Sequence, residues 1–288
     1  MLLGTVSLWA LNFTVSKYIL DEGFRPLAYS AVRYACAALI FFAITLVWEG
    51  SLRIGGGQIP LMVMSTALLF ANQLSFVYAL KFTSATTVAL LFGTLPIFTA
   101  ILARGSGVEQ LSGRFWAAAL LSFAGVALVA VGSGGNLSAN LKGDALAVSG
   151  SITWAGYSVA IAPLMRRYSP FRLSAVFLAA VTVPLALAGS GQLASQSFDF
   201  GALVWLGFAF AVLGPLVTTN FLWFTAIDRV GPARASLFAN LQPFLAAIVA
   251  LLLLSEHITT LQIVGGLAIG GGIVLASRRG PAPEPPAE

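Results

Sequence analysis

Residues 93–109, GTLPIFTAILARGSGVE, match residues 240–256, NLQPFLAAIVALLLLSE, and this match decides the fold. Each stretch has a proline at its fourth position and ends on a glutamate. Pro96 and Pro243 are separated by 243 minus 96, or 147, residues, and the two glutamates have the same separation. The register holds without a gap over residues 79–128 and their counterparts. A fixed register of this length indicates an internal duplication.

The composition of the chain indicates a membrane protein. Of its 288 residues, 58% are hydrophobic and only 9% are charged, and the mean hydropathy is +0.92. A soluble domain has about 25% charged residues, so most of this surface must face lipid. The net charge of +5 does not indicate a nucleic-acid partner, because the basic residues stand singly between apolar runs and form no patch.

Apolar runs long enough to cross a bilayer, about 20 residues each, follow one another along the chain. They do not alternate polar and apolar residues as barrel strands do. The predicted fold class is therefore an all-α integral membrane protein. We predict ten transmembrane helices, at residues 3–20, 27–48, 59–80, 84–104, 112–132, 144–165, 170–189, 202–225, 232–254 and 260–277.

The duplication extends to the other spans, as the match of Trp9 with Trp154 shows. Five spans separate equivalent positions, and because five is odd, the second copy must cross the membrane in the opposite sense. Such inverted repeats are a common plan of secondary transporters. We predict two inverted five-helix repeats, at residues 1–138 and 139–279, and a disordered, proline-rich cytoplasmic tail at 280–288.

The distribution of basic residues predicts the orientation, because cytoplasmic loops are enriched in Lys and Arg. With the N-terminus inside, ten basic residues near span ends lie on the inner side and four on the outer side. Both termini are therefore predicted to be cytoplasmic. The inner residues are Arg53, Arg104, Arg114, Arg166, Arg167, Arg172, Arg229, Arg234, Arg278 and Arg279, and the outer ones are Lys17, Arg25, Lys81 and Lys142.

The doubled pattern of a proline-containing span, a terminal glutamate and a glycine-rich span resembles the EamA-type transporters of the drug/metabolite transporter superfamily. Within it, the chain is most similar to bacterial exporters of aromatic and neutral amino acids. The resemblance covers nearly the whole chain and implies a ten-helix carrier of the bacterial inner membrane without a covalent cofactor. The first copy departs from the pattern at residues 104–107, RGSG, where the second has LLLL.

Two helical faces mix indole rings with polar groups deep inside their spans. Trp9, Asn12 and Phe13 share one face by the i, i+3, i+4 rule, and Trp154, with Tyr157 and Ser158, shares the other. Such faces suit a cavity wall, although aromatic packing between helices is the alternative. The predicted substrate-binding residues are Trp9, Asn12, Phe13, Tyr78, Phe92, Trp154, Tyr157, Ser158, Asn220, Trp223, Asn240 and Gln242.

The two prolines predict breaks in helical hydrogen bonding. Proline has no N–H for the carbonyl four residues earlier, so Phe92 and Ala239 should have freed carbonyls. Lipid cannot satisfy such groups, and we expect them to face the cavity. Pro96 and Pro243 are therefore predicted hinges of the transport cycle. A static kink satisfied by Ser or Thr is the alternative.

Ionisable residues are scarce inside the spans. The acidic residues lie in loops, at span ends or in the tail, and the single histidine, His257, lies beside Glu256 at a helix end. The sequence therefore predicts no catalytic residues, metal site or cofactor, and no intramembrane proton relay. Arg33 lies about two turns into the second span, where we expect it to snorkel to the outer face more readily than to bind a substrate carboxylate.

These observations predict a secondary transporter that exports neutral and aromatic L-amino acids by alternating access through a central cavity between the repeats. A broad-specificity drug exporter is the alternative within carriers. A passive channel would show charged rings or a filter motif, and neither is present. The Gly266 and Gly270 step permits close helix packing; we expect it to act within a monomer, with a homodimer as the alternative.

Overall fold

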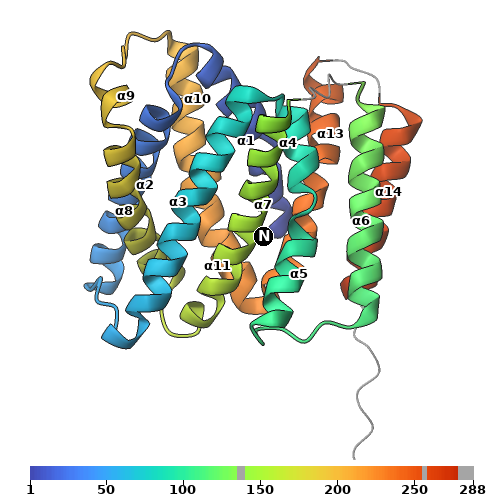
Figure 1. Ribbon diagram of the computed structural model, residues 1–288, viewed down its shortest axis with the longest axis horizontal. Helices are drawn as coiled ribbons and strands as arrows, with labels where there is room; N and C mark the ends of the chain where they lie inside the picture. The colour runs from blue at the N-terminus through green and yellow to red at the C-terminus, as the bar shows by residue number, and fades with distance from the viewer. Residues whose placement is uncertain (135–139, 255–257, 278–288) are drawn as a thin grey trace, which may run out of the picture.

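The computed structural model describes residues 1–134, 140–254 and 258–277, with the backbone alone for residues 249–254 (Figure 1). The described chain is a bundle of helices that run mostly between its two ends. They are α1 (Leu2–Asp21), α2 (Pro26–Glu49), η1 (Gly56–Gln58), α3 (Ile59–Phe82), α4 (Ala85–Phe92), α5 (Leu95–Gly105), α6 (Gly113–Gly132), α7 (Leu141–Met165), α8 (Pro170–Ala188), α9 (Ser190–Ala194), α10 (Ala202–Val212), η2 (Leu213–Thr218), α11 (Thr219–Val230), α12 (Pro232–Leu237), η3 (Phe238–Leu241), α13 (Gln242–Leu254) and α14 (Thr260–Ser277).

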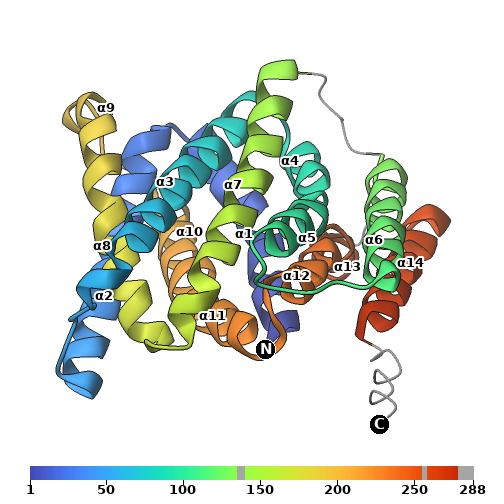
Figure 2. The ribbon, with the colours of Figure 1, turned by 60° about the horizontal axis from the view of Figure 1, so that its bottom comes forward.

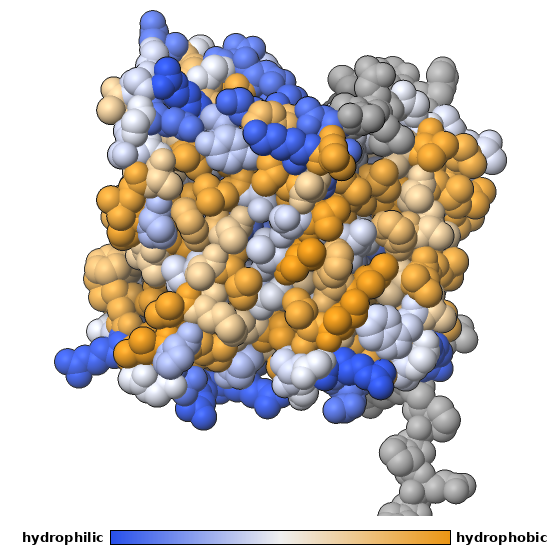
Figure 3. Space-filling model, viewed as in Figure 1, coloured by the Kyte–Doolittle hydropathy of each residue, from blue (hydrophilic) through white to orange (hydrophobic). Residues whose placement is uncertain are grey.

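Eight helical segments of the described chain are long and apolar enough to cross a membrane. A broad apolar belt runs across the middle of the visible face of the bundle, and hydrophilic residues gather above and below it (Figure 3). Large apolar side chains such as Leu39, Leu187 and Leu267 are mostly exposed on the bundle. In water these side chains would destabilise the fold, whereas in a bilayer they contact lipid tails. The all-helical membrane fold is thus confirmed.

Helix α1 is not among the eight apolar segments, although it runs through the middle of the bundle (Figure 2). It packs against helices from both halves of the chain, including α3, α11 and α13. Its polar residues Asn12 and Ser16 are buried. An interior position explains the lower hydropathy, because the helix contacts cavity and protein on sides that would otherwise face lipid.

The fourth predicted span is two helices and not one kinked helix. Helix α4 ends at Phe92, and α5 begins at Leu95, so Pro96 lies in the first turn of α5. The single helix predicted at residues 84–104 is thus interrupted before Pro96, because proline is tolerated at a helix start, where its missing N–H has no intrahelical partner. The related prediction about hydrogen bonding still follows, since Pro96 has no N–H to offer the Phe92 carbonyl.

The ninth span is divided in the same way. Helix α12 passes into the 3₁₀ turn η3, and α13 begins at Gln242, which places Pro243 in its first turn. Figure 1 shows α5 descending from its break and α13 ascending from its own. The eighth span also departs from a regular helix, because η2 is a π-helical segment that contains Pro215.

Glycines allow α6 and α14 to cross at very close range. A Cβ atom on Gly125 would lie 2.6 Å from the Gly265 carbonyl oxygen, and one on Gly265 would lie 2.5 Å from the Gly125 oxygen. The two glycines of the GxxxG step in the last span differ: Gly266 packs against the Phe244 ring, whereas Gly270 borders open space. Close packing inside the chain therefore uses Gly266 but not Gly270.

Several predictions lie outside the described residues. They concern Glu256, His257, the boundary between residues 138 and 139, and the tail at 280–288.

Candidate substrate-binding cavity

A cavity of ≈ 690 Å³ lies at the centre of the bundle. The wall combines aromatic rings, aliphatic side chains, amides and one arginine. It consists of Trp9, Asn12, Phe13, Arg33, Tyr34, Leu69, Asn72, Gln73, Phe76, Phe92, Leu95, Trp154, Leu178, Pro215, Leu216, Asn220 and Gln242.

The structure brings many of the predicted site residues together at this wall, and they come from both halves of the chain. Those that line the cavity are Trp9, Asn12, Phe13, Phe92, Trp154, Asn220 and Gln242. The others lie outside the wall, and they are Tyr78, Tyr157, Ser158, Trp223 and Asn240. Helical spacing therefore found the elements that surround the cavity, but it did not separate side chains at the wall from those one layer behind.

Three tryptophans form a cluster at one side of the cavity. The Trp9 ring lies 5.5 Å from that of Trp154 and 4.9 Å from that of Trp223, between centroids. The Trp9 indole donates a hydrogen bond of 3.0 Å to the Thr219 hydroxyl. The protein therefore already provides an acceptor for this N–H. The indole contributes an aromatic surface instead.

Trp223, Tyr157 and Ser158 support this cluster from behind. Trp223 is fully buried, and its indole donates to the Ser158 hydroxyl at 3.3 Å. Tyr157 is also buried and lies 5.5 Å from the Trp154 ring centroid. These residues hold the Trp9 and Trp154 rings in place, so substitutions here would act on the cavity through its wall.

Tyr78 and Asn240 point to other partners. The Tyr78 hydroxyl accepts a hydrogen bond of 3.1 Å from Gln192, in the short helix α9. The Asn240 amide donates to Ser122 of α6 at 3.0 Å, and its oxygen is buried without a hydrogen-bond partner. The 3₁₀ turn η3 directs the Asn240 side chain towards α6 and away from the cavity wall.

Arg33 is a cavity residue, and the expectation that it snorkels to the outer face was wrong. It is only 3% exposed and lies at the wall. Its Nη1 lies 3.5 Å from Asn12 Oδ1 and 3.3 Å from the Tyr29 hydroxyl, and Nη2 donates to Gln73 Oε1 at 3.1 Å. These acceptors are uncharged. The arrangement draws the guanidinium inwards and away from the membrane surface.

Gln73 connects this arginine to its neighbours. Its Oε1 also accepts from the Tyr34 hydroxyl at 3.0 Å, while its Nε2 donates to Ser30 at 2.9 Å. Gln73 and Tyr34 are 2% exposed and line the cavity. The predicted site omitted both, although Gln73 follows Asn72 inside an apolar run. A buried amide pair within a span was the available signal.

The second halves of both broken helices begin at the cavity. Leu95 is the first residue of α5 and Gln242 the first of α13, and both line the wall. Their separation is 242 minus 95, or 147, the offset of the duplicated stretches. Unpaired N–H groups and the positive end of the helix dipole occur at such starts. Two related breaks therefore direct favourable fields for negative charge towards the same space.

A second cavity, of ≈ 970 Å³, adjoins the first and shares Phe13 and Gln242 with it. Its other lining residues come mainly from α4, α6 and α13, and include Thr86, Ser133 and Thr259. These three lie near the ends of helices where Figure 1 shows the upper edge of the bundle. Phe13 and Gln242 thus divide the central cavity from a space that extends to one end of the molecule.

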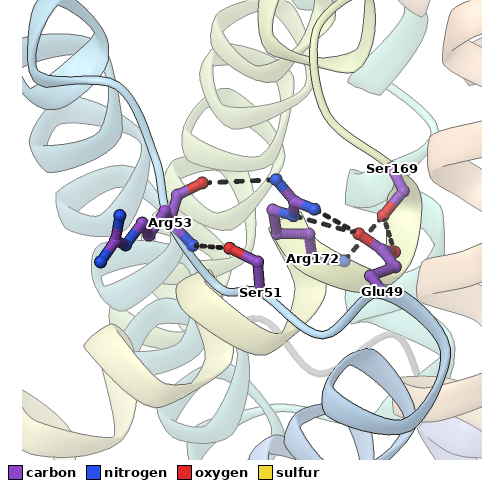
Figure 4. Close-up of polar contacts among 5 residues, drawn as sticks. All are labelled: Glu49, Ser51, Arg53, Ser169 and Arg172. Carbon is purple, nitrogen blue, oxygen red and sulfur yellow. Dashed lines mark hydrogen bonds and ion pairs between the residues drawn. The ribbon is translucent and has the colours of Figure 1, made fainter.

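Polar contacts at the opposite end join the two halves of the chain (Figure 4). Arg172, in the first turn of α8, donates to Glu49 at the end of α2, with Nε 3.0 Å and Nη2 2.9 Å from Oε2. The Ser169 hydroxyl donates to the other Glu49 oxygen and accepts from the Arg172 amide. The Arg172 Nη1 also lies 3.4 Å from the Arg53 carbonyl oxygen. These contacts fix the start of α8 to the end of α2.

Glu109 makes a second connection at the same end. Its Oε1 accepts from the Ala233 amide at 2.9 Å, so it ties the segment before α6 to the start of α12. A Cβ atom on Gly231 would lie 2.2 Å from this oxygen, so the contact requires glycine there. Burial raises the pKa of Glu109, against the lowering effects of the Ala233 N–H and Arg234. Glu109 thus ties a loop to a helix end.

A helical membrane bundle around a partly polar central cavity is typical of multi-pass membrane transporters. The model of the EamA-like transporter family matches residues 1–131 and 141–278. The chain belongs to this family and is a transporter rather than an enzyme. As a membrane transporter, it acts on small molecules in a lipid bilayer.

Relatives cover nearly the whole chain. The protein named uncharacterized transporter YyaM, of Bacillus subtilis, is 26% identical over 96% of this chain and 92% of its own length. A probable terminal-alkyne amino-acid exporter of Streptantibioticus cattleyicolor is 27% identical over 96% of this chain and 91% of its own. A solved crystal structure matches with a TM-score of 0.76 at 19% identity, covering 95% of this chain and 96% of that one. This last similarity shows the fold alone.

Proposed function

We propose that this protein exports neutral L-amino acids, including aromatic ones, by alternating access through the central cavity. The observation that carries the proposal is the composition of the cavity wall. Indole and phenyl rings line part of it, while Asn12, Gln73 and Arg33 supply polar and charged groups. An amphipathic zwitterion with a large apolar side chain matches both parts of this wall.

A zwitterion in this cavity must have both charges solvated by fixed groups, because burying an unpaired ion is costly. Asn72, Asn220, Gln242 and the Phe92 carbonyl are the proposed acceptors for the ammonium. The proposed aromatic surface consists of Trp9 and Trp154. Ring faces also attract a cation, by about 1–2 kcal/mol when desolvated.

The proposed architecture is ten transmembrane helices in two inverted five-helix repeats, divided at residues 138 and 139, with both termini cytoplasmic. The opposite directions of α5 and α13 in Figure 1 and their common offset support it. Pro96 and Pro243 begin the second halves of the two broken helices, so they are the proposed hinges. We propose a monomer in a bacterial inner membrane, which agrees with the internal packing of Gly266.

A broad-specificity drug exporter is the second candidate. Its support is the largely apolar and aromatic wall, which would accept many lipophilic molecules. However, among the described residues that line the cavity there is no Asp or Glu to hold a cationic drug. A relative named as a probable amino-acid exporter also favours the first candidate.

The test is counterflow of labelled L-phenylalanine in proteoliposomes, with a panel of neutral amino acids and lipophilic cations as competitors. Trp154→Ala should reduce the rate by about tenfold, since a stacked aromatic wall residue contributes about 0.5–1.5 kcal/mol beyond its buried area. Trp48→Ala is the matched control, because Trp48 is 68% exposed on the outside of the bundle. Saturable counterflow that Trp154→Ala impairs and Trp48→Ala spares supports the proposal. Competition by lipophilic cations alone would overturn it.

A further inference from the structure

Arg33 is a buried cation whose neighbours do not neutralise it. We propose that its guanidinium is the carboxylate-binding group of the central cavity, so that cargo must carry a free carboxylate. This inference rests on the proposed function in taking the central cavity as the substrate site. It goes beyond that function by naming the residue that would select the cargo, through the negative charge of the cargo's carboxylate.

The acidic residues of the described chain do not pair with Arg33. The ion pairs found there are Lys17 with Asp21 and Arg172 with Glu49. Arg33 has instead three neutral oxygen acceptors, and the Tyr29 ring centroid lies 4.9 Å from its Cζ. These groups orient the guanidinium but leave its charge in place. An intramembrane cation of this kind is expected to have a functional partner.

The guanidinium also has unused donor capacity. Its Nε is buried and has no hydrogen-bond partner, while Nη2 is bonded only to Gln73. Nε and Nη2 form one edge of the planar fork that binds a carboxylate through two parallel hydrogen bonds. The positive ends of α5 and α13 begin at the same cavity, at Leu95 and Gln242. These two helix starts favour negative charge, whereas the carbonyl end of α4 at Phe92 opposes it.

The duplication shows that the shared fold does not need this cation. Ser30 matches Ser174 at an offset of 144, and the same offset places Phe177 at the position of Arg33. Phe177 is fully buried and lies 5.7 Å from the Tyr157 ring, between centroids. One copy thus has an arginine where the other packs an aromatic ring. A purely structural role would not explain why the polar version faces the cavity.

The aromatic rings place the rest of the ligand. Phe13 lies at the wall 5.7 Å from Phe76 and 5.9 Å from Phe92, between centroids, so these rings form an apolar surface beside the Asn12 and Arg33 contact. A carboxylate on Arg33 would therefore leave an attached aromatic group facing this surface. The predicted ligand class is aromatic and large apolar carboxylates, with neutral amino acids among them.

The experiment measures binding by the full-length protein in detergent, using quenching of tryptophan fluorescence, because Trp9 and Trp154 line the cavity. The probes are L-phenylalanine, 3-phenylpropanoate, which lacks the ammonium, and phenethylamine, which lacks the carboxylate. We expect the two carboxylates to bind and phenethylamine to bind at least about tenfold more weakly, the difference expected for a charge-assisted pair. Arg33→Gln should abolish this preference, and Arg172→Gln, the same substitution in a paired arginine, should preserve it.

A second variant covers failure of Arg33→Gln to fold. Gln73→Glu places a carboxylate at the oxygen that already accepts from Arg33, so it should neutralise the cation and weaken both carboxylate probes about tenfold. Lost selectivity in a folded Arg33→Gln supports the proposal, since a structural defect would weaken all three probes together. If Arg33→Gln does not fold, Gln73→Glu decides by the same criterion. Equal binding of phenethylamine and phenylalanine by the wild type, or unchanged selectivity in the deciding variant, overturns the proposal.

The outcomes separate this inference from the proposed function. If L-phenylalanine is transported but phenethylamine competes as well as 3-phenylpropanoate does, the role of Arg33 is overturned and amino-acid export stands. If 3-phenylpropanoate binds in an Arg33-dependent manner but L-phenylalanine is neither bound nor transported, the carboxylate site stands and amino-acid export is overturned. If none of the three probes binds, both proposals are overturned.

Discussion

Arg33 and Arg172 show two ways in which this protein holds an arginine. Arg172 lies at one end of the bundle, 23% exposed, with a carboxylate of Glu49 at 2.9 Å. Arg33 lies beside the central cavity, 3% exposed, among amide and hydroxyl oxygens. The paired arginine joins two helices near the membrane surface, where water also solvates it. The unpaired one keeps its charge in the interior, where solvation is poorest.

The difference teaches how to distinguish a structural charge from a functional one. Burying an uncompensated ion is unfavourable, so a protein under selection for stability alone would replace Arg33 or give it an acidic partner. Phe177, at the equivalent place in the second copy, shows that an apolar residue fits this helix packing. We therefore interpret Arg33 as a residue kept for binding, at the expense of stability.

The largest expected effect is an opposite response of stability to the same substitution. Arg172→Gln should lower the free energy of unfolding by about 1.5–3 kcal/mol, because it removes charged hydrogen bonds to Glu49. Arg33→Gln should leave that free energy unchanged or raise it, since it removes a buried charge and retains a polar side chain. The thermal midpoint of the ligand-free protein in detergent measures both. Equal losses in the two variants would show that Arg33 is structural.

A double-mutant cycle would measure how strongly the paired arginine, Arg172, interacts with Glu49. Glu49→Gln and Arg172→Gln, alone and together, should give a coupling energy of about 1 kcal/mol for this partly exposed pair. The coupling should decrease at high salt, because screening weakens exposed ion pairs. Thermal midpoints at low and high ionic strength provide the measurement. A coupling near zero at both would remove the distinction between Arg172 and an unpaired surface charge.

The smallest expected effect on stability is at Glu109. Its carboxyl group is partly buried and accepts a hydrogen bond from a backbone amide. Burial raises its pKa, so the folded protein holds this proton more tightly than the unfolded chain. Stability from this group is therefore greatest below the usual glutamate pKa and falls as pH rises through the raised value. Wild type should lose stability relative to Glu109→Gln as pH rises above the usual glutamate pKa, by less than about 1 kcal/mol because of solvent screening. Parallel pH profiles of the thermal midpoint would contradict this expectation.

Much of the cavity wall was predictable because helical periodicity places every third or fourth residue on one face. Trp9, Asn12 and Phe13 reached the wall for this reason. Periodicity failed where the backbone departs from a regular helix or where two layers share a face. The 3₁₀ turn η3 directs Asn240 to α6, and Trp223 lies behind the tryptophans of the wall.

Proline positions show the same limit. The sequence predicts that Pro96 and Pro243 interrupt hydrogen bonding, because this follows from the proline ring. It does not say whether the helix bends or ends, since that depends on the packing around the break. In the structure each proline lies in the first turn of a new helix, and the start of that helix meets the cavity.

By itself, the sequence determined the membrane environment, the helical class and the family, because hydropathy, span length and a doubled motif are local or periodic properties of the chain. Only the tertiary structure decided which polar groups meet. Arg33 has Asn12 from α1 and Gln73 from α3 as partners, 21 and 40 residues away along the chain. Such contacts depend on how helices pack in three dimensions. The same packing turned an arginine expected at the membrane surface into the charged group of the central cavity.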